Sequence, residues 1–129
     1  MKMHGTAGVV LILVGAAALP LRAHHGIAGF SMAKPLTIEG TVSKFEWTNP
    51  HGYLYVDVKD GQSQVATWRV EFGSVGNMRV RGLSKSSFKP GDMVRVVGAP
   101  RLDGSKEMFF QEGSFASGEA FGRPNTDTR

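Results

Sequence analysis

Apolar and polar residues alternate along most of the chain after residue 35, and this period of two predicts β-strands. In a first strand that starts at Leu36, Ile38 and Val42 fall on one face. The phase then shifts, because Phe45 lies on an odd position. We therefore expect a bulge near Ser43, or a bend in a long first strand.

Two more strands are predicted over residues 53–59 and 64–72, joined by a turn at Asp60-Gly61. Their alternation places one set of side chains toward a core and the other set, including Tyr53 and Tyr55, on the outer face. With the first strand and a later one at 93–98, the residues expected to point inward are Ile38, Val42, Leu54, Val56, Val58, Trp68, Val70, Val94 and Val96.

Residues 73–82 break the alternation, and Ser74 is a good N-cap for a helix of one or two turns. After the strand at 93–98, residues 107–112 predict a fifth strand, with a looser sixth stretch around 114–121. Three strands, a short helix and two strands follow the order of the OB-fold, a five-stranded Greek-key barrel. The expected class is all-β with one short helix and an OB-like barrel, with a small β-sandwich as the alternative.

The first 23 residues have the pattern of a signal peptide: Lys2 precedes an apolar run at 6–19, and Ala23 supplies a small residue for cleavage. This run is shorter than the roughly 20 residues that a membrane-spanning helix needs. We therefore expect a periplasmic or secreted protein that meets the membrane only during export. The expected division is a signal peptide at 1–23, an arm at 24–35, a barrel domain at 36–122 and a frayed tail at 123–129.

Charge and composition narrow the function only slightly. The chain of 129 residues has 15 basic and 11 acidic residues, and removal of Lys2 and Arg22 leaves 13 basic residues and a net charge of +2. Without a basic run, we expect no nucleic-acid partner. The chain contains none of the common catalytic motifs, so an enzyme is unsupported. It also has no cysteine, which excludes disulfides.

One surface is a candidate binding site for an unknown small ligand or a protein partner. The loop at 48–52 is dense in turn-forming residues, and in an OB-fold the second and third strands present the ligand-binding face. The candidate ligand-binding residues are Trp47, Asn49, His51, Tyr53, Tyr55 and Arg69. Alternatively, the aromatic residues form cross-strand pairs that only stabilise an exposed sheet.

Cleavage after Ala23 would leave a chain that begins His24-His25 with a free α-amine. Imidazole and amine nitrogens suit copper(II), zinc(II) and nickel(II), and His51 offers a further nitrogen. His24, His25 and His51 therefore form a candidate metal site, with copper as the expected ion. The alternative is an incidental polar start and an ordinary turn histidine.

Several segments resemble a family of small exported bacterial proteins, catalogued as a domain of unknown function. The specific part is Trp47-Thr48-Asn49-Pro50-His51, supported by Ala23-His24-His25 and by Lys89-Pro90-Gly91-Asp92. The resemblance implies a signal peptide and a small β-barrel-like domain, without an assigned activity. Residues 26–32 depart from the family's pattern because they lack its acidic residues.

Overall fold

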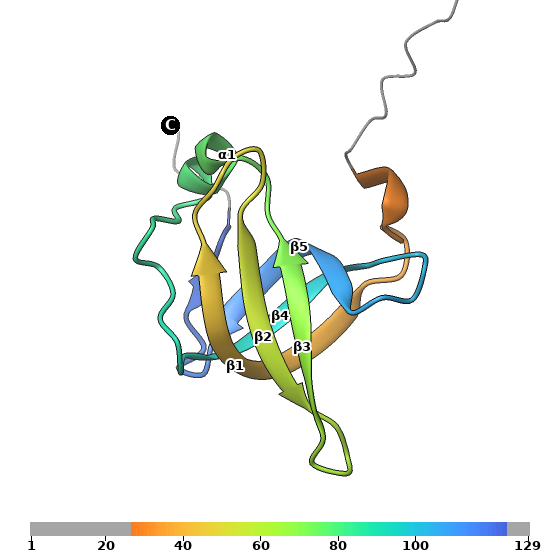
Figure 1. The fold of residues 1–129 in the computed structure, drawn as a ribbon. Coiled ribbons are helices and arrows are strands. Elements are labelled where there is room, and N and C mark those ends of the chain that lie inside the picture. The colour runs from red at the N-terminus through yellow and green to blue at the C-terminus, as the bar shows by residue number, and fades with distance from the viewer. Residues whose placement is uncertain (1–26, 124–129) are drawn as a thin grey trace, which may run out of the picture.

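Six strands form one sheet that closes on itself in the computed structural model, which describes residues 27–123. The strand order is β3-β2-β1-β4-β5-β6, and β3 also pairs in parallel with β5. This last pairing closes a five-stranded barrel (Figure 1), as expected for an OB-like fold and not for a sandwich of two sheets. The strands are β1 Leu36–Glu46, β2 Tyr53–Lys59, β3 Val65–Glu71, β4 Met93–Pro100, β5 Glu107–Phe115 and β6 Ala120–Phe121.

The first strand, β1, serves two neighbours and bends between them. Its first half pairs with β4, from Leu36 to Thr41, and its second half pairs with β2. The register with β2 shifts between Val42 and Lys44, which confirms the expected bulge near Ser43. Because a bulge increases the local twist, it lets one strand pass from one side of the barrel to the other.

The barrel encloses an apolar core that agrees closely with the alternation. Seven of the nine residues expected to point inward are buried, while Val58 and Trp68 are partly buried and pack against the edge of the core. Aromatic residues from later elements complete the interior. The buried residues beyond the predicted set include Phe72, Met78, Leu83, Phe88, Met108, Phe110 and Phe121.

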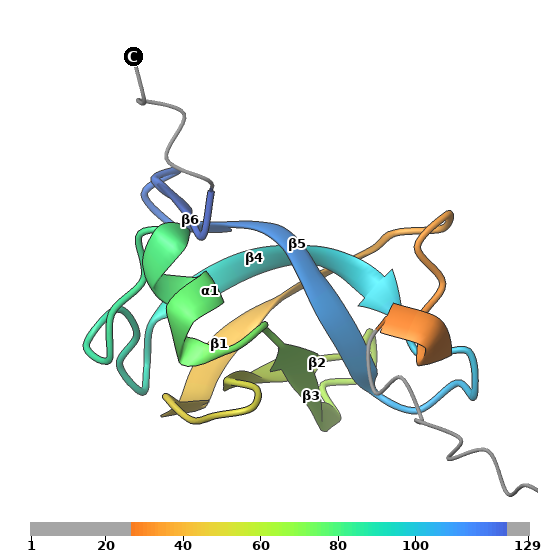
Figure 2. The ribbon, with the colours of Figure 1, turned by 90° about the horizontal axis from the view of Figure 1, so that it is seen from above.

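One short helix, α1 Val75–Val80, covers an end of the barrel. The Ser74 hydroxyl oxygen accepts a hydrogen bond from the Asn77 amide at 3.2 Å, so Ser74 is the predicted N-cap. Figures 1 and 2 show α1 beside the β1–β2 loop, and Figure 1 shows the β2–β3 hairpin projecting at the opposite end. Neither this helix nor the turn at Ile27–Gly29 is long and apolar enough to cross a bilayer, within residues 27–123.

The described part of the N-terminal arm docks on the loop between β4 and β5. A 3-10 turn at Ile27–Gly29 leads into Phe30, which is only 6% exposed. The Ser31 amide donates to the Pro100 carbonyl at 2.8 Å, and the Leu102 amide donates to the Gly29 carbonyl at 3.0 Å. The signal-peptide prediction, His24 and His25 lie outside the described residues.

Candidate functional site

A cavity of about 320 Å³ lies where the arm, the β1–β2 loop and the β4–β5 loop meet β3. We call it the rim cavity. It is lined by Phe30, Pro50, His51, Tyr53, Arg69, Glu71, Arg101 and Glu107. Four of these residues have charged side chains and one is a histidine. Glu71 and Glu107 are the buried charged residues of the described chain. Buried charges are costly unless they are paired, so such a cluster marks a candidate site.

Glu107 holds two arginines in place. Its carboxylate lies 2.9 Å from Arg69 Nη2 and 3.3 Å from Arg101 Nε. Each guanidinium group also covers an aromatic ring: Arg69 lies 4.8 Å from the Tyr53 ring centroid, and Arg101 lies 4.7 Å from that of Phe30. Because Glu107 begins β5 opposite Arg69, the parallel β3–β5 pairing creates this contact.

Glu71 and His51 form the second pair in the rim cavity. Their Oε1 and Nδ1 atoms are 3.2 Å apart, and His51 Nδ1 also lies 3.3 Å from the Phe72 carbonyl oxygen. The backbone places His51 here, since the Gly52 carbonyl accepts a hydrogen bond from the Phe72 amide at 2.9 Å. The β1–β2 loop is thereby tied to the end of β3.

Burial raises the pKa of the Glu71 carboxyl above its ordinary value of 4.5, and the negative charge of Glu107 adds to this effect. His51, Arg101 and Arg69 oppose it by stabilising the ionised form. The raised direction means that Glu71 binds its proton more tightly in the folded chain than in the unfolded chain.

Glu71→Gln should therefore change how the stability of the barrel depends on pH. A carboxyl with a raised folded pKa gives a stabilisation that is fully present below about pH 4.5 and is lost as the pH rises through the folded pKa. Glutamine cannot ionise, so the variant should gain stability relative to the wild type across this range. Urea unfolding at a series of pH values measures the difference. Glu112→Gln, which removes an exposed carboxylate from β5, controls for the lost charge. A stability difference between Glu71→Gln and the wild type that stays constant with pH would contradict the expectation.

The structure brings only part of the predicted ligand-binding set together. His51, Tyr53 and Arg69 line the rim cavity, and Tyr55 lies next along β2, directly opposite Arg69 in the strand register. The Tyr55 hydroxyl donates to Glu46 Oε2 at 3.4 Å, and Lys44 Nζ lies 5.4 Å from its ring centroid. Tyr53, Tyr55 and Arg69 thus form one outer surface, which we call the β2–β3 face.

Trp47 and Asn49 do not line the rim cavity. The Trp47 ring packs at the edge of the core, 6.0 Å from the Phe45 ring centroid. The Asn49 Oδ1 atom accepts a hydrogen bond from the Val75 amide at 2.9 Å, which fastens the β1–β2 loop to the start of α1. In the structure, both residues support the loop that carries His51.

Sequence reasoning missed Glu71, Glu107, Arg101 and Phe30. The alternation in the third strand places Glu71 on the same face as Arg69, which precedes it by two residues. This pattern could have identified Glu71 as a candidate site residue. The other three come from segments far away in the sequence, and Arg69 and Glu107 are 38 positions apart. Local patterns hold no information about such contacts.

A larger hollow of about 500 Å³ lies along the outer side of β1 and β2, next to Val65 and Met93. Both of these side chains are strongly exposed, at 58% and 63%. The hollow has no cluster of paired ionisable groups like that of the rim cavity. We therefore place the candidate site at the rim cavity, although it is the smaller of the two.

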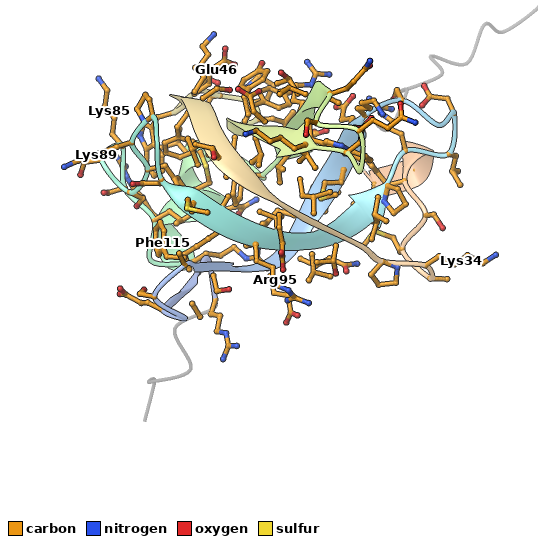
Figure 3. All side chains as sticks on the ribbon, turned by 90° about the horizontal axis from the view of Figure 1, so that it is seen from below. Lys34, Glu46, Lys85, Lys89, Arg95 and Phe115 are labelled. Atoms are coloured by element: carbon orange, nitrogen blue, oxygen red, sulfur yellow. The ribbon has the colours of Figure 1, made fainter. Side chains whose placement is uncertain are left out.

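Basic side chains are scattered over the described surface. Figure 3 shows Lys34 at the opposite end of the molecule from Lys85 and Lys89, with Arg95 on a further side. Two cations at or beside the β2–β3 face are paired, because Lys44 of β1 contacts Glu46 and Arg69 contacts Glu107.

Solved structures with a similar fold come from a nucleic-acid-binding protein. The mitochondrial single-stranded DNA binding protein Rim1 of S. cerevisiae matches with a TM-score of 0.50 and 8% identity, over 64% of this chain and 93% of that chain. A second crystal structure of that protein matches with a TM-score of 0.44 and 12% identity, over 64% and 92% of the two chains. No curated protein matches the sequence.

The expectation of no nucleic-acid partner is wrong. It relied on a small net charge, whereas the fold is one that a single-stranded DNA-binding protein also has. Proteins with OB-folds bind single strands by combining a positively charged groove with aromatic side chains on which successive bases stack.

The sequence itself matches the model of a family of unknown function over residues 11–110. This range includes the β1–β2 loop, the rim cavity residues and most of the barrel. The family resemblance seen in the Trp47 to His51 motif is thereby confirmed. The chain belongs to the family of unknown function DUF6152.

Proposed function

We propose that this chain is a binding module whose β2–β3 face stacks a flat heteroaromatic ring, such as a nucleobase. The observation that carries the proposal is the arrangement of Tyr53, Tyr55 and Arg69. Arg69 is the register partner of Tyr55 on the neighbouring strand, and its guanidinium group lies 4.8 Å from the Tyr53 ring centroid. Two rings and one planar cation thus share one partly exposed surface.

This surface has the chemistry that base recognition needs. Stacking one base on an aromatic side chain contributes about 1–3 kcal/mol to the binding free energy, whichever base it is. Arg69 adds hydrogen-bond donors beside the rings, and Glu107 holds it in position from below. The fold shared with a single-stranded DNA-binding protein supports the same ligand class.

The ion pairs at this face indicate how the ligand would be held. Lys44 and Arg69 already have acidic partners, so few counterions would be released when a phosphate backbone binds. The ligand is therefore held mainly by ring stacking, and its affinity depends only weakly on salt. As part of the same proposal, residues 1–23 are a signal peptide that directs this module to the periplasm or outside the cell.

A Tyr55→Ala/Arg69→Ala double variant tests the face. Fluorescence anisotropy with a labelled oligothymidine should show binding to the wild type, and the double variant should lose at least about tenfold in affinity, since it removes one ring and the planar cation. Thymidine monophosphate as a competitor distinguishes a mononucleotide site from one that needs a strand. Arg95→Ala, which removes an exposed cation from β4, is the matched control and should bind normally.

Both side chains are partly exposed, so the double variant should fold, and its thermal unfolding curve verifies this. Undiminished binding by the double variant would remove the β2–β3 face from the proposal. Failure of the wild type to bind either probe would remove the nucleobase as the ligand.

A further inference from the structure

The rim cavity opens beside the aromatic surface to which the proposed function assigns the ligand. Tyr53 and Arg69 belong to both, and Tyr53 is the register partner of Glu71 across the β2–β3 pair. Directly opposed residues of an antiparallel pair have Cβ atoms about 4.5–5.5 Å apart, so the Glu71 side chain lies at the edge of a ring that is stacked on this face. The cavity, at about 320 Å³, is at the lower limit of small-ligand pockets and suits a single base.

The two buried carboxylates of the cavity differ in how much of their acceptor capacity is used. Both side chains are 10% exposed, and Glu107 accepts a hydrogen bond from an arginine at each of its oxygens. Glu71 has one cationic or imidazole neighbour in the described part of the chain, His51 Nδ1 at 3.2 Å. The Phe72 carbonyl oxygen, at 3.3 Å, competes for the single hydrogen of that nitrogen. Because a carboxylate has about four acceptor sites, most of the acceptor capacity of Glu71 is open to a ligand.

An ionised carboxylate only accepts hydrogen bonds, so it selects among flat rings by the donors on their edges. Guanine presents two adjacent donors, N1–H and the N2 amino group, which match both oxygens of one carboxylate as the fork of an arginine does. Adenine and cytosine each pair an amino group with an acceptor nitrogen, and thymine has one N–H between two carbonyl oxygens. Building on the proposed stacking function, we propose that the preferred base is guanine and that Glu71 recognises its N1–H and N2 amino edge.

The rest of the rim cavity suits the same ring. Guanine carries an acceptor oxygen, O6, next to N1–H, and arginine is the commonest donor to this oxygen. Arg101 lines the cavity and uses its Nε atom toward Glu107, which leaves its Nη groups for a ligand. An acceptor and a donor group in one cavity thus correspond to the two kinds of atom on the guanine edge.

Guanosine and inosine monophosphates differ by the N2 amino group alone, so they measure the contact with Glu71 without a change in the protein. Calorimetric titration of the full chain should give a Kd for guanosine monophosphate at least about tenfold below that for inosine monophosphate, the usual effect of one hydrogen bond to a charged group. Both nucleotides have the same fused ring system and the same phosphate. Stacking and ion pairing therefore cannot produce this ratio.

Glu71→Gln tests the residue itself. Glutamine nearly keeps the shape of glutamate but has one acceptor oxygen and no charge, so the ratio of the two Kd values should fall close to one. Glu112→Gln, which removes an exposed carboxylate from β5, is the matched control and should keep the full ratio. Equal binding of the two nucleotides by the wild type, or a preference that survives Glu71→Gln, would overturn the assignment.

Oligothymidine separates this inference from the proposed function. It lacks the paired donors of guanine, so its binding reports stacking on the β2–β3 face. If the wild type binds oligothymidine and has equal Kd values for the two nucleotides, guanine recognition is refuted and the stacking function stands. Failure of all three probes to bind would overturn both.

Discussion

Phe110→Ala should lower the free energy of unfolding by about 3–5 kcal/mol, the usual cost of removing a buried phenylalanine ring. Phe110 is 1% exposed, and its ring centroid lies 4.5 Å from that of Phe72 and 5.7 Å from that of Phe121. The Arg81 guanidinium group covers another side of the ring at 5.0 Å. Truncation would leave a cavity whose walls come from three separate segments of the chain, so the structure cannot easily collapse to fill it.

Urea or thermal unfolding of Phe110→Ala measures this loss. Leu102→Ala is the control, because it also removes apolar atoms but from a side chain that is 69% exposed, and its effect should stay within about 0.5 kcal/mol. Equal losses in the two variants would show that the aromatic cluster is not the core of the barrel.

The sequence was sufficient to predict the strands and their inner faces. Leu54 and Val56 are both 0% exposed, because a period of two fixes which side chains of β2 face inward once one face is buried. The bulge near Ser43 and the cap at Ser74 were also predictable, since each depends on residues within a few positions of one another. Interactions between residues that are close in the sequence determine these features.

The rim cavity was predictable only in part, because barrel closure creates it. The alternation of β3 placed Arg69 on the outer face, yet nothing near Arg69 in the sequence indicates that Glu107 will lie opposite it. Trp47 and Asn49 were candidates because of their residue types and their loop. Their roles in packing and in holding α1 depend on contacts with Phe45 and Val75 that only the folded barrel supplies.

The same closure explains why Glu71 is buried although it lies on the outer face. In an open sheet its carboxylate would point to solvent, like that of Asp57 on the neighbouring strand. Here the β1–β2 loop with His51 and the parallel strand β5 cover it, and its side chain is only 10% exposed. A site with buried charge therefore forms where the two ends of the sheet meet, and neither end encodes it alone.

Gly40→Ala should destabilise the barrel by about 3 kcal/mol, at the upper end of the cost of overpacking. Gly40 lies in β1 where the strand passes from β4 toward β2, and β2 comes very close at this point. A Cβ atom at Gly40 would overlap the Asp57 carbonyl oxygen and would lie 2.9 Å from both the Asp57 carbonyl carbon and Val56 Cγ1. Backbone atoms in a paired strand cannot move aside as the end of a flexible side chain can, so β1 and β2 must separate locally.

Gly61→Ala is the matched control for this substitution. It adds the same methyl group in the β2–β3 hairpin, where a Cβ atom would meet nothing within 4 Å. Chemical denaturation of both variants measures the two effects, and the control should remain close to the wild type. Similar stability of the two variants would show that β1 and β2 do not approach as closely as the structure places them. A large loss of stability in Gly40→Ala alone would show that the path of β1 across the barrel depends on a strand position without a side chain. This position lies close to the bulge that bends the same strand.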